Sequence, residues 1–324
     1  MNQDLLTSID DIITKINTDR TYSRIIKENM QDSLYKEAMR HSAQLELKDI
    51  EKLKKSERKE LNRDLKNLMK GWQLLANQGI HIGTLLRLGK TIEPNGHPYE
   101  YTRHVDVRYG NHEGPSPQTL PYELNNVVES LRFSSEHTVL KAIDTHIEMV
   151  RAHPYEDGNG RAARLVSNFI LAKHRIPPYI ITAEEKPEYI KMIDNTLQDR
   201  KMKKSSLWVP SAAEEIFHDY IGEKILDNAK KIEEKLEKNR TYMITLNNIM
   251  PETKHLVKNR IKYHAKNMGA PVKINSYETG KKKSICLEVT GDLSEEQLDT
   301  VLNNARQKKK FNYQLDCHDD IIKY

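Results

Sequence analysis

The side chains best suited to chemistry gather in one short stretch, His-Pro-Tyr-Glu-Asp-Gly-Asn-Gly-Arg-Ala-Ala-Arg at residues 153–164. Gly158 and Gly160 on either side of Asn159 allow successive backbone N–H groups to turn toward one anion. The apolar helical pattern that follows would place this turn at a helix N-terminus, where the helix dipole also favours a phosphate. The stretch therefore predicts a phosphate-binding turn.

Charged and titratable groups flank the turn at short, fixed offsets. Arg161 and Arg164 are three residues apart in the first helical turn, so their guanidinium groups would share one face and reach phosphate oxygens. Asp157 offers a hard oxygen ligand where a Mg²⁺ ion bridging phosphates would lie. His153 is the near neighbour able to take a proton at neutral pH. Together these groups predict a phosphoryl- or nucleotidyl-transfer site.

The stretch resembles the motif of the Fic family, HPFx(D/E)GNGRxxR, at every defining position except the Phe, which is Tyr155 here. The exchange keeps an aromatic anchor for the loop. The resemblance runs from about residue 37 to about residue 220. Residues 103–120 are similar to the family's flap hairpin and its Pro-rich continuation, and residues 176–197 to the segment that closes over the adenine.

The resemblance implies an activity, the transfer of AMP from Mg-ATP to a Ser, Thr or Tyr hydroxyl of a target protein with release of pyrophosphate. It also implies a role for each matching residue: His153 as the base, Asp157 as the Mg²⁺ ligand, Gly158, Asn159 and Gly160 as the phosphate cradle, Arg161 and Arg164 as phosphate ligands, and Tyr189 as an adenine contact. Leu197 stands where the family often has Asn, which leaves the nucleobase preference open.

A second family feature is an inhibitory helix that reads (S/T)xxxE(G/N), whose Glu pairs with the second motif arginine. Ser42 and Glu46 have this spacing upstream of the core, and Leu47 replaces the usual Gly or Asn. The resemblance implies that Glu46 pairs with Arg164 and inhibits the enzyme. An ordinary i,i+4 pair on a helix surface explains the same spacing, so both interpretations stay open.

The elements that would position these residues are mainly helical. Leucine and isoleucine spacing predicts an N-terminal helical region over residues 1–76, which contains the candidate inhibitory helix. A catalytic core over 77–225 follows, with a β-hairpin in the Gly- and Pro-rich segment 89–121, and then a linker helix over 226–239. Residues 240–324 predict a small α+β domain of order β-α-β-β-α-β, as in ferredoxin-like folds.

The composition sets broad limits on the class of protein. Charged residues make up 31% and aromatic residues 6%, and no apolar run is long enough to span a bilayer. The two cysteines, Cys286 and Cys317, are too few for a disulfide framework and lack metal-ligand spacing. The N-terminus shows no Sec-type signal. We therefore expect a cytoplasmic protein, or one delivered into another cell by a route without such a signal.

Two other classes of function remain open at this point. The same site could transfer a phosphate, or could remove AMP from a modified protein with Glu46 aligning a water. Alternatively, the protein could bind nucleic acid and have an inactive core, because the net charge of +5 is confined to residues 240–324, with 15 Lys and Arg against 10 Asp and Glu. The strands expected there lack the paired aromatics typical of RNA-binding sheets. The motif alone also leaves a homodimer open.

Overall fold

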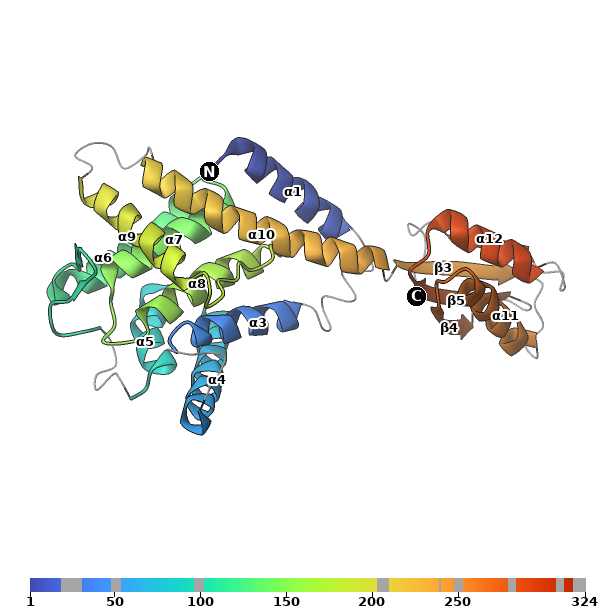
Figure 1. Ribbon diagram of the computed structural model, residues 1–324, viewed down its shortest axis with the longest axis horizontal. Helices are drawn as coiled ribbons and strands as arrows, with labels where there is room; N and C mark the ends of the chain where they lie inside the picture. Colours follow the sequence, from blue (N-terminus) through green and yellow to red (C-terminus); the bar gives the residue numbers. More distant parts are fainter. Residues whose placement is uncertain are drawn as a thin grey trace. The chain divides into compact units, whose positions relative to one another are not determined.

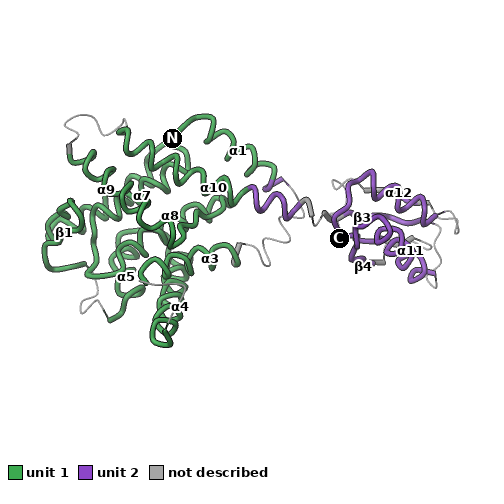
Figure 2. Tube along the Cα trace, in the orientation of Figure 1, with its two compact units in different colours: residues 1–15, 26–229 green, residues 16–25, 230–324 purple. Residues whose placement is uncertain are grey.

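The computed structural model describes residues 1–18, 31–47, 54–95, 102–202, 210–238, 240–247, 253–278, 284–306 and 312–316. The chain forms two compact units, one of residues 1–15 and 26–229 and the other of residues 16–25 and 230–324 (Figure 2). Within the described ranges, no helix has the length and apolar character needed to cross a membrane.

The first unit is built from helices. They are α1 (Gln3–Thr18), α3 (Gln31–Gln44), α4 (Lys55–Gln78), α5 (Ile82–Ile92), α6 (Leu120–Phe133), α7 (Thr138–Ala152), α8 (Asn159–Lys173), α9 (Lys186–Met202) and α10 (Ala212–Lys238). Helix α8 runs through their middle and contacts α3, α4, α5 and α7 (Figure 1). This helix is buried on all sides, so its polar side chains need internal partners. Ser167 donates to the Ala142 carbonyl, and the Asn168 amide bonds both backbone groups of Tyr179.

The hairpin predicted between residues 89 and 121 is present, and its strands are short. Strand β1 (Arg108–Tyr109) pairs antiparallel with β2 (His112–Glu113), and the 3₁₀ helix η2 (Pro117–Thr119) leads on to α6. Residues 96–101, within the segment expected to contain this hairpin, lie outside the described residues. We call residues 103–115 the flap.

One boundary differs from the one that the sequence predicted. The irregular segment expected from residue 89 begins later, because α5 continues to Ile92 and buries Leu88 and Ile92 on its core-facing side. Helix α10 is continuous from Ala212 to Lys238 and includes the start of the predicted linker helix at residue 226, and the two units divide at residues 229/230 inside α10. Ile221, Ile225, Ala229 and Ile232 keep one apolar stripe along α10, so a single helix forms across the boundary.

The second unit contains the small α+β domain, with strands and helices in the predicted order. The elements are β3 (Arg240–Asn247), α11 (Lys254–Asn267), β4 (Val272–Glu278), β5 (Ser284–Gly291), α12 (Glu295–Arg306) and β6 (Asn312–Asp316). The sheet has the order β4-β5-β3-β6 with every pair antiparallel, which is the ferredoxin-like arrangement. Alternate residues of the strands, such as Ile244 and Leu246, form one apolar core with the two helices.

We expect residues 240–324 to fold when expressed alone. Every buried residue of this apolar core lies between Ile244 and Ala305, so the isolated segment retains all of them. Circular dichroism should show a cooperative thermal transition for the isolated segment, and a matching fragment of residues 1–239 should unfold in its own transition. A non-cooperative melt of residues 240–324 would contradict this division of the chain.

Candidate active site

The turn of residues 153–159 joins α7 to α8 and is closed by one side chain. Asn159 accepts a hydrogen bond from the Tyr155 amide at 2.8 Å and donates to the Tyr155 carbonyl at 2.7 Å. Gly158 precedes the helix with a φ of 81°, a left-handed conformation that favours glycine. The chain therefore reaches the N-terminus of α8 through a tight, internally bonded turn, as the Gly-Asn-Gly pattern predicts.

The aromatic anchor of the turn is Tyr155, which is fully buried. Its hydroxyl donates to the Leu85 carbonyl at 2.6 Å, so the oxygen that distinguishes it from Phe has a partner. The ring packs directly on Gly89 of α5, where an added Cβ would lie 2.3 Å from the nearest ring atom. Gly89 thus leaves the space that the anchor fills.

Replacing Gly89 with alanine should destabilise the protein by about 3 kcal/mol, because the new Cβ overlaps a fully buried ring that has no room to move. Urea unfolding followed by circular dichroism measures the change. Gly83→Ala on the same helix is the matched control: its Cβ would meet only the His81 ring at 3.3 Å, and alanine favours the helix. Equal stability of the two variants would show that α5 and the turn do not pack as described.

His153 ends α7 in a left-handed conformation, with φ 44° and ψ 56°. Its ring stacks on the Tyr109 ring of the flap, with centroids 4.1 Å apart and planes at 21°. The Tyr109 hydroxyl in turn donates to the Val150 carbonyl at 2.6 Å. The flap and α7 together therefore fix the imidazole in one orientation.

Burial is the largest of the causes that lower the pKa of His153 to about 4; the positive charge of Arg103 acts in the same direction, and the Val150 carbonyl opposes both. The imidazole is consequently neutral at pH 7. A neutral imidazole can accept a proton, which is the role that the sequence predicts for it.

Arg164 is buried and makes three contacts with the end of α3. Its Nε donates to Ser42 Oγ at 2.8 Å, and one terminal nitrogen lies 3.2 Å from the Ser42 carbonyl and 3.1 Å from Glu46 Oε1. Ser42 is 6% exposed, so it is not part of an ordinary surface pair. Glu46 lies in the turn after α3 ends at Gln44, and not on the helix as the spacing suggested.

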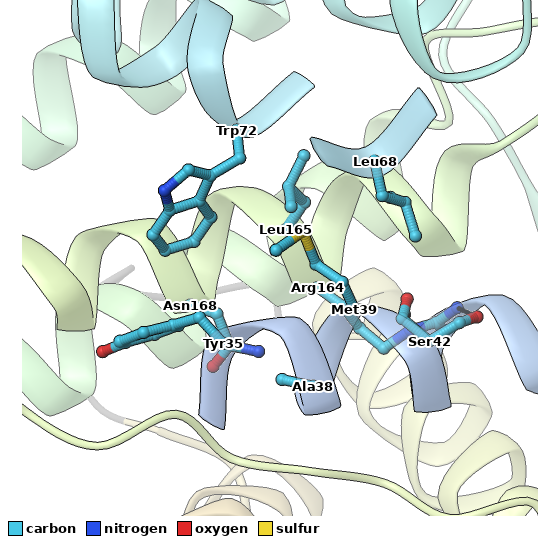
Figure 3. A pocket seen from close by; sticks show the side chains of 9 residues that line it. All are labelled: Tyr35, Ala38, Met39, Ser42, Leu68, Trp72, Arg164, Leu165 and Asn168. Atoms are coloured by element: carbon cyan, nitrogen blue, oxygen red, sulfur yellow. Dashed lines mark hydrogen bonds between the residues drawn. The ribbon is translucent and has the colours of Figure 1, made fainter. Parts of the chain in front are cut away.

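Aromatic contacts hold α3 in this place. Tyr35 packs on Trp72 of α4 at 4.9 Å, and Trp72 packs edge-on against Phe169 of α8 at 5.2 Å. Tyr35, Ser42 and Arg164 are among the residues that line the small pocket between α3, α4 and α8 (Figure 3). The Lys186 ammonium also donates to the Leu45 carbonyl, next to Glu46. The Glu46 contact is therefore supported by a docked helix.

Arg161 has other partners than Arg164, although the two residues are only three positions apart in α8. One terminal nitrogen lies 3.1 Å from Glu93 Oε2 and 3.3 Å from Asp64 Oδ2, and the other lies 3.5 Å from Asp157 Oδ1. Asp64 and Glu93 are 3% and 5% exposed, and two buried carboxylates require a positive partner. In this structure Arg161 thus pairs with Asp64 of α4 and with Glu93 at the end of α5, whereas Arg164 contacts Ser42 and Glu46.

Asp157 is mostly exposed, and its Oδ1 accepts a hydrogen bond from the Gly158 amide. The described residues include no group of three or more side chains that could hold a metal on their own. A single exposed carboxylate beside a helix N-terminus suits Mg²⁺, which usually keeps water and substrate phosphates as its other ligands.

Tyr189, the residue predicted to contact adenine, lies in the core. Its ring is 5% exposed and lies under the Arg164 guanidinium at 5.9 Å. Its hydroxyl is 2.7 Å from His146 Nε2, and Tyr179 bonds the other nitrogen of that ring at 2.5 Å. The Tyr189 ring thus packs against the Arg164 guanidinium on its core-facing side. His146 was missed in the sequence, because its partners come from segments that are distant along the chain.

Acid should destabilise the protein through the buried His146. Burial and, to a smaller extent, the positive charge of Arg164 lower the pKa of His146 to about 3, while the unfolded chain binds the proton near pH 6.5. The unfolded state therefore binds more protons as the pH falls below 6.5, and stability declines by about 2 kcal/mol at pH 5 through this histidine. Urea unfolding at pH 7, 6 and 5 should show a shallower decline for His146→Gln than for the wild type. Parallel declines would contradict the neutral, buried imidazole.

Comparisons with known proteins agree with this geometry. Residues 78–171 match the model of the Fic/DOC family. The protein adenylyltransferase Fic of Nematostella vectensis is 29% identical over 124 residues, which is 36% of this chain and 29% of that protein. The protein adenylyltransferase fic-1 of Caenorhabditis elegans is 32% identical over 115 residues, 34% of this chain and 23% of that protein. The chain thus matches less than a third of the length of these relatives.

Solved structures show the same fold. A Fic-domain signalling protein of Bacteroides thetaiotaomicron gives a TM-score of 0.54 at 17% identity, covering 70% of this chain and 95% of that one. A Fic family protein of Desulfovibrio desulfuricans gives 0.54 at 14% identity, covering 98% and 96%. The flap and the turn at the start of α8 both lie within residues 78–171, the segment that matches the Fic/DOC family model.

Proposed function

We propose that this protein is an adenylyltransferase that moves AMP from Mg-ATP to a hydroxyl group of a target protein. The observation that carries the proposal is the neutral His153 imidazole, held by the flap beside the anion-binding turn at the start of α8. The names of the relatives that match the same segment support it.

The chemistry follows from the parts of the site. His153 takes the proton of the target hydroxyl, and the oxygen then forms a bond to the α-phosphorus of ATP. The bond from that phosphorus to the bridging oxygen of the β-phosphate breaks, and pyrophosphate leaves. The amides at the start of α8 and the Arg164 guanidinium stabilise the phosphate charge. Mg²⁺ at Asp157 would neutralise part of that charge when bound.

We further propose that the structure represents an inhibited state. Arg164 is engaged by Ser42 and Glu46, so this guanidinium is not free to hold a phosphate until the end of α3 moves. The same carboxylate could serve in removing AMP from a modified target by aligning a water.

Labelled nucleotides test the proposal. The wild type and Glu46→Gly are each incubated with Mg²⁺ and ATP labelled at the α-phosphate or at the γ-phosphate, and protein-bound label is read by mass spectrometry. We expect an adenylyl group on protein, carrying the α-label only. Transfer of the γ-label would instead identify a phosphotransferase, and no transfer by either variant would refute the proposal. Parallel reactions with GTP, CTP and UTP give the base preference.

A further inference from the structure

Arg103 is a fully buried arginine that the sequence did not single out. It lies 50 residues before His153, at the start of the flap. In the described part of the chain no ion pair with a carboxylate is formed by its guanidinium, and burial lowers its pKa. Burying a charge without an ionic partner is costly, so the protein must satisfy its N–H groups in another way.

Backbone carbonyls on two sides satisfy this guanidinium. Toward α7, Nε donates to the His153 carbonyl at 2.8 Å, and a terminal nitrogen lies 3.5 Å from the Ala152 carbonyl. Toward the flap, the terminal nitrogens donate to the Val105 carbonyl at 2.6 Å and to the Pro115 carbonyl at 2.5 Å. The planar fork of arginine can span such a set of acceptors, and the single ammonium of lysine cannot.

The backbone of Arg103 and the nearby Gly114 also contribute to this arrangement. Its own amide donates to the Pro154 carbonyl at 2.8 Å, so the main chain and the side chain both bond the turn after α7. Gly114 leaves room for the guanidinium, because an added Cβ there would lie 2.9 Å from a terminal nitrogen.

The conformation of His153 shows what these bonds accomplish. A non-glycine residue with φ 44° is in a sparsely populated region and persists only when its surroundings hold it there. The His153 amide bonds the Met149 carbonyl, the ring stacks on Tyr109, and the carbonyl bonds Arg103. Arg103 and Tyr109 both come from the flap.

We propose that Arg103 is a positioning residue that locks the His153 backbone in its left-handed conformation and fastens the flap to it, so that the base keeps its orientation when a target hydroxyl arrives. The inference rests on the proposed function, in which His153 is the base. Arg103 bonds the backbone carbonyl of the base and so acts through His153. A small displacement of a catalytic group is enough to lower the rate about a hundredfold.

Two substitutions separate geometry from charge. Arg103→Lys keeps the positive charge near His153 and loses the fork, whereas Arg103→Met loses both. We expect kcat for AMP transfer to fall about a hundredfold in each, with ATP affinity within about threefold of the wild type. Arg108→Met, which removes a charge from an exposed position of the flap, is the matched control and should keep kcat.

The pH profile distinguishes the two variants. The positive charge of Arg103 lowers the His153 pKa, and the other charged groups acting on that imidazole, His112 and Asp157, stay in place. The acidic limb of kcat/KM should therefore move to higher pH in Arg103→Met and stay near its place in Arg103→Lys. NMR titration of the His153 ring should show the same pattern and does not need activity. The NMR titration separates the inference from the proposed function, because the His153 pKa can be measured even if the protein transfers no AMP.

The inference fails if a folded Arg103→Met variant retains wild-type kcat and the wild-type titration of His153. It also fails if the activity lost by Arg103→Met equals the fraction of the variant that is unfolded at each temperature, while the His153 titration stays as in the wild type. Should Arg103→Met not fold, Gly114→Ala displaces the guanidinium without removing it. This variant should lower kcat and shift the His153 ring signals, and wild-type behaviour in both would overturn the proposal.

Discussion

Replacing His153 with alanine should lower the rate of AMP transfer about a thousandfold, while ATP binding stays within about twofold of the wild type. The imidazole takes the hydroxyl proton in the transition state and holds no phosphate in the ground state. Its removal therefore lowers kcat and leaves ATP binding unchanged. Thermal stability should change little, because the deleted ring is half-buried and neutral at pH 7. Single-turnover kinetics and isothermal titration with ATP measure the two effects separately.

The control for this variant is His174→Ala, at the other end of α8, where the imidazole is exposed. It should transfer AMP at the wild-type rate. Transfer at the wild-type rate by His153→Ala would remove His153 as the base, and a joint loss of ATP binding would mean that the ring holds the nucleotide.

Glu46→Gly should raise the rate of AMP transfer roughly tenfold to a few hundredfold at saturating Mg-ATP, the equivalent of one or two charge-assisted hydrogen bonds. The substitution removes the carboxylate 3.1 Å from Arg164 and frees that nitrogen for a phosphate. The Ser42 bonds to the same guanidinium remain, so Ser42→Ala combined with Glu46→Gly should release it further.

A double-mutant cycle tests whether the gain acts through this contact. Arg164→Ala should cancel the gain from Glu46→Gly, because two changes in one interaction are not additive. Glu37→Ala removes an exposed carboxylate from the same helix and should leave the rate unchanged. Equal rates for Glu46→Gly and the wild type would mean that the end of α3 docks on Arg164 without inhibiting the enzyme.

The spacing of Ser42 and Glu46 identified two residues that contact Arg164, but it placed Glu46 on a helix. A helical reading places Glu46 one turn after Ser42 on the same face. In the structure the helix ends at Gln44, and the following turn carries Glu46 to Arg164. Leu47, which breaks the family pattern, packs against the core and does not prevent the contact.

The sequence by itself determined the features that depend on neighbours along the chain. The Gly-Asn-Gly turn closes on its own side chain, the helices follow their apolar spacing, and the strands and helices of residues 240–324 alternate in the predicted order. These features arise from interactions within a few residues, which a single sequence displays directly.

Only the tertiary structure decided which distant groups meet. Arg103 reaches the carbonyl of His153, Gly89 receives the ring of Tyr155, and Arg161 is held by acidic residues from two other helices. Tyr189 lies beneath Arg164 in the core for the same reason. A buried charge or ring takes the partners that packing brings within reach, and that choice depends on contacts between segments that no local spacing encodes.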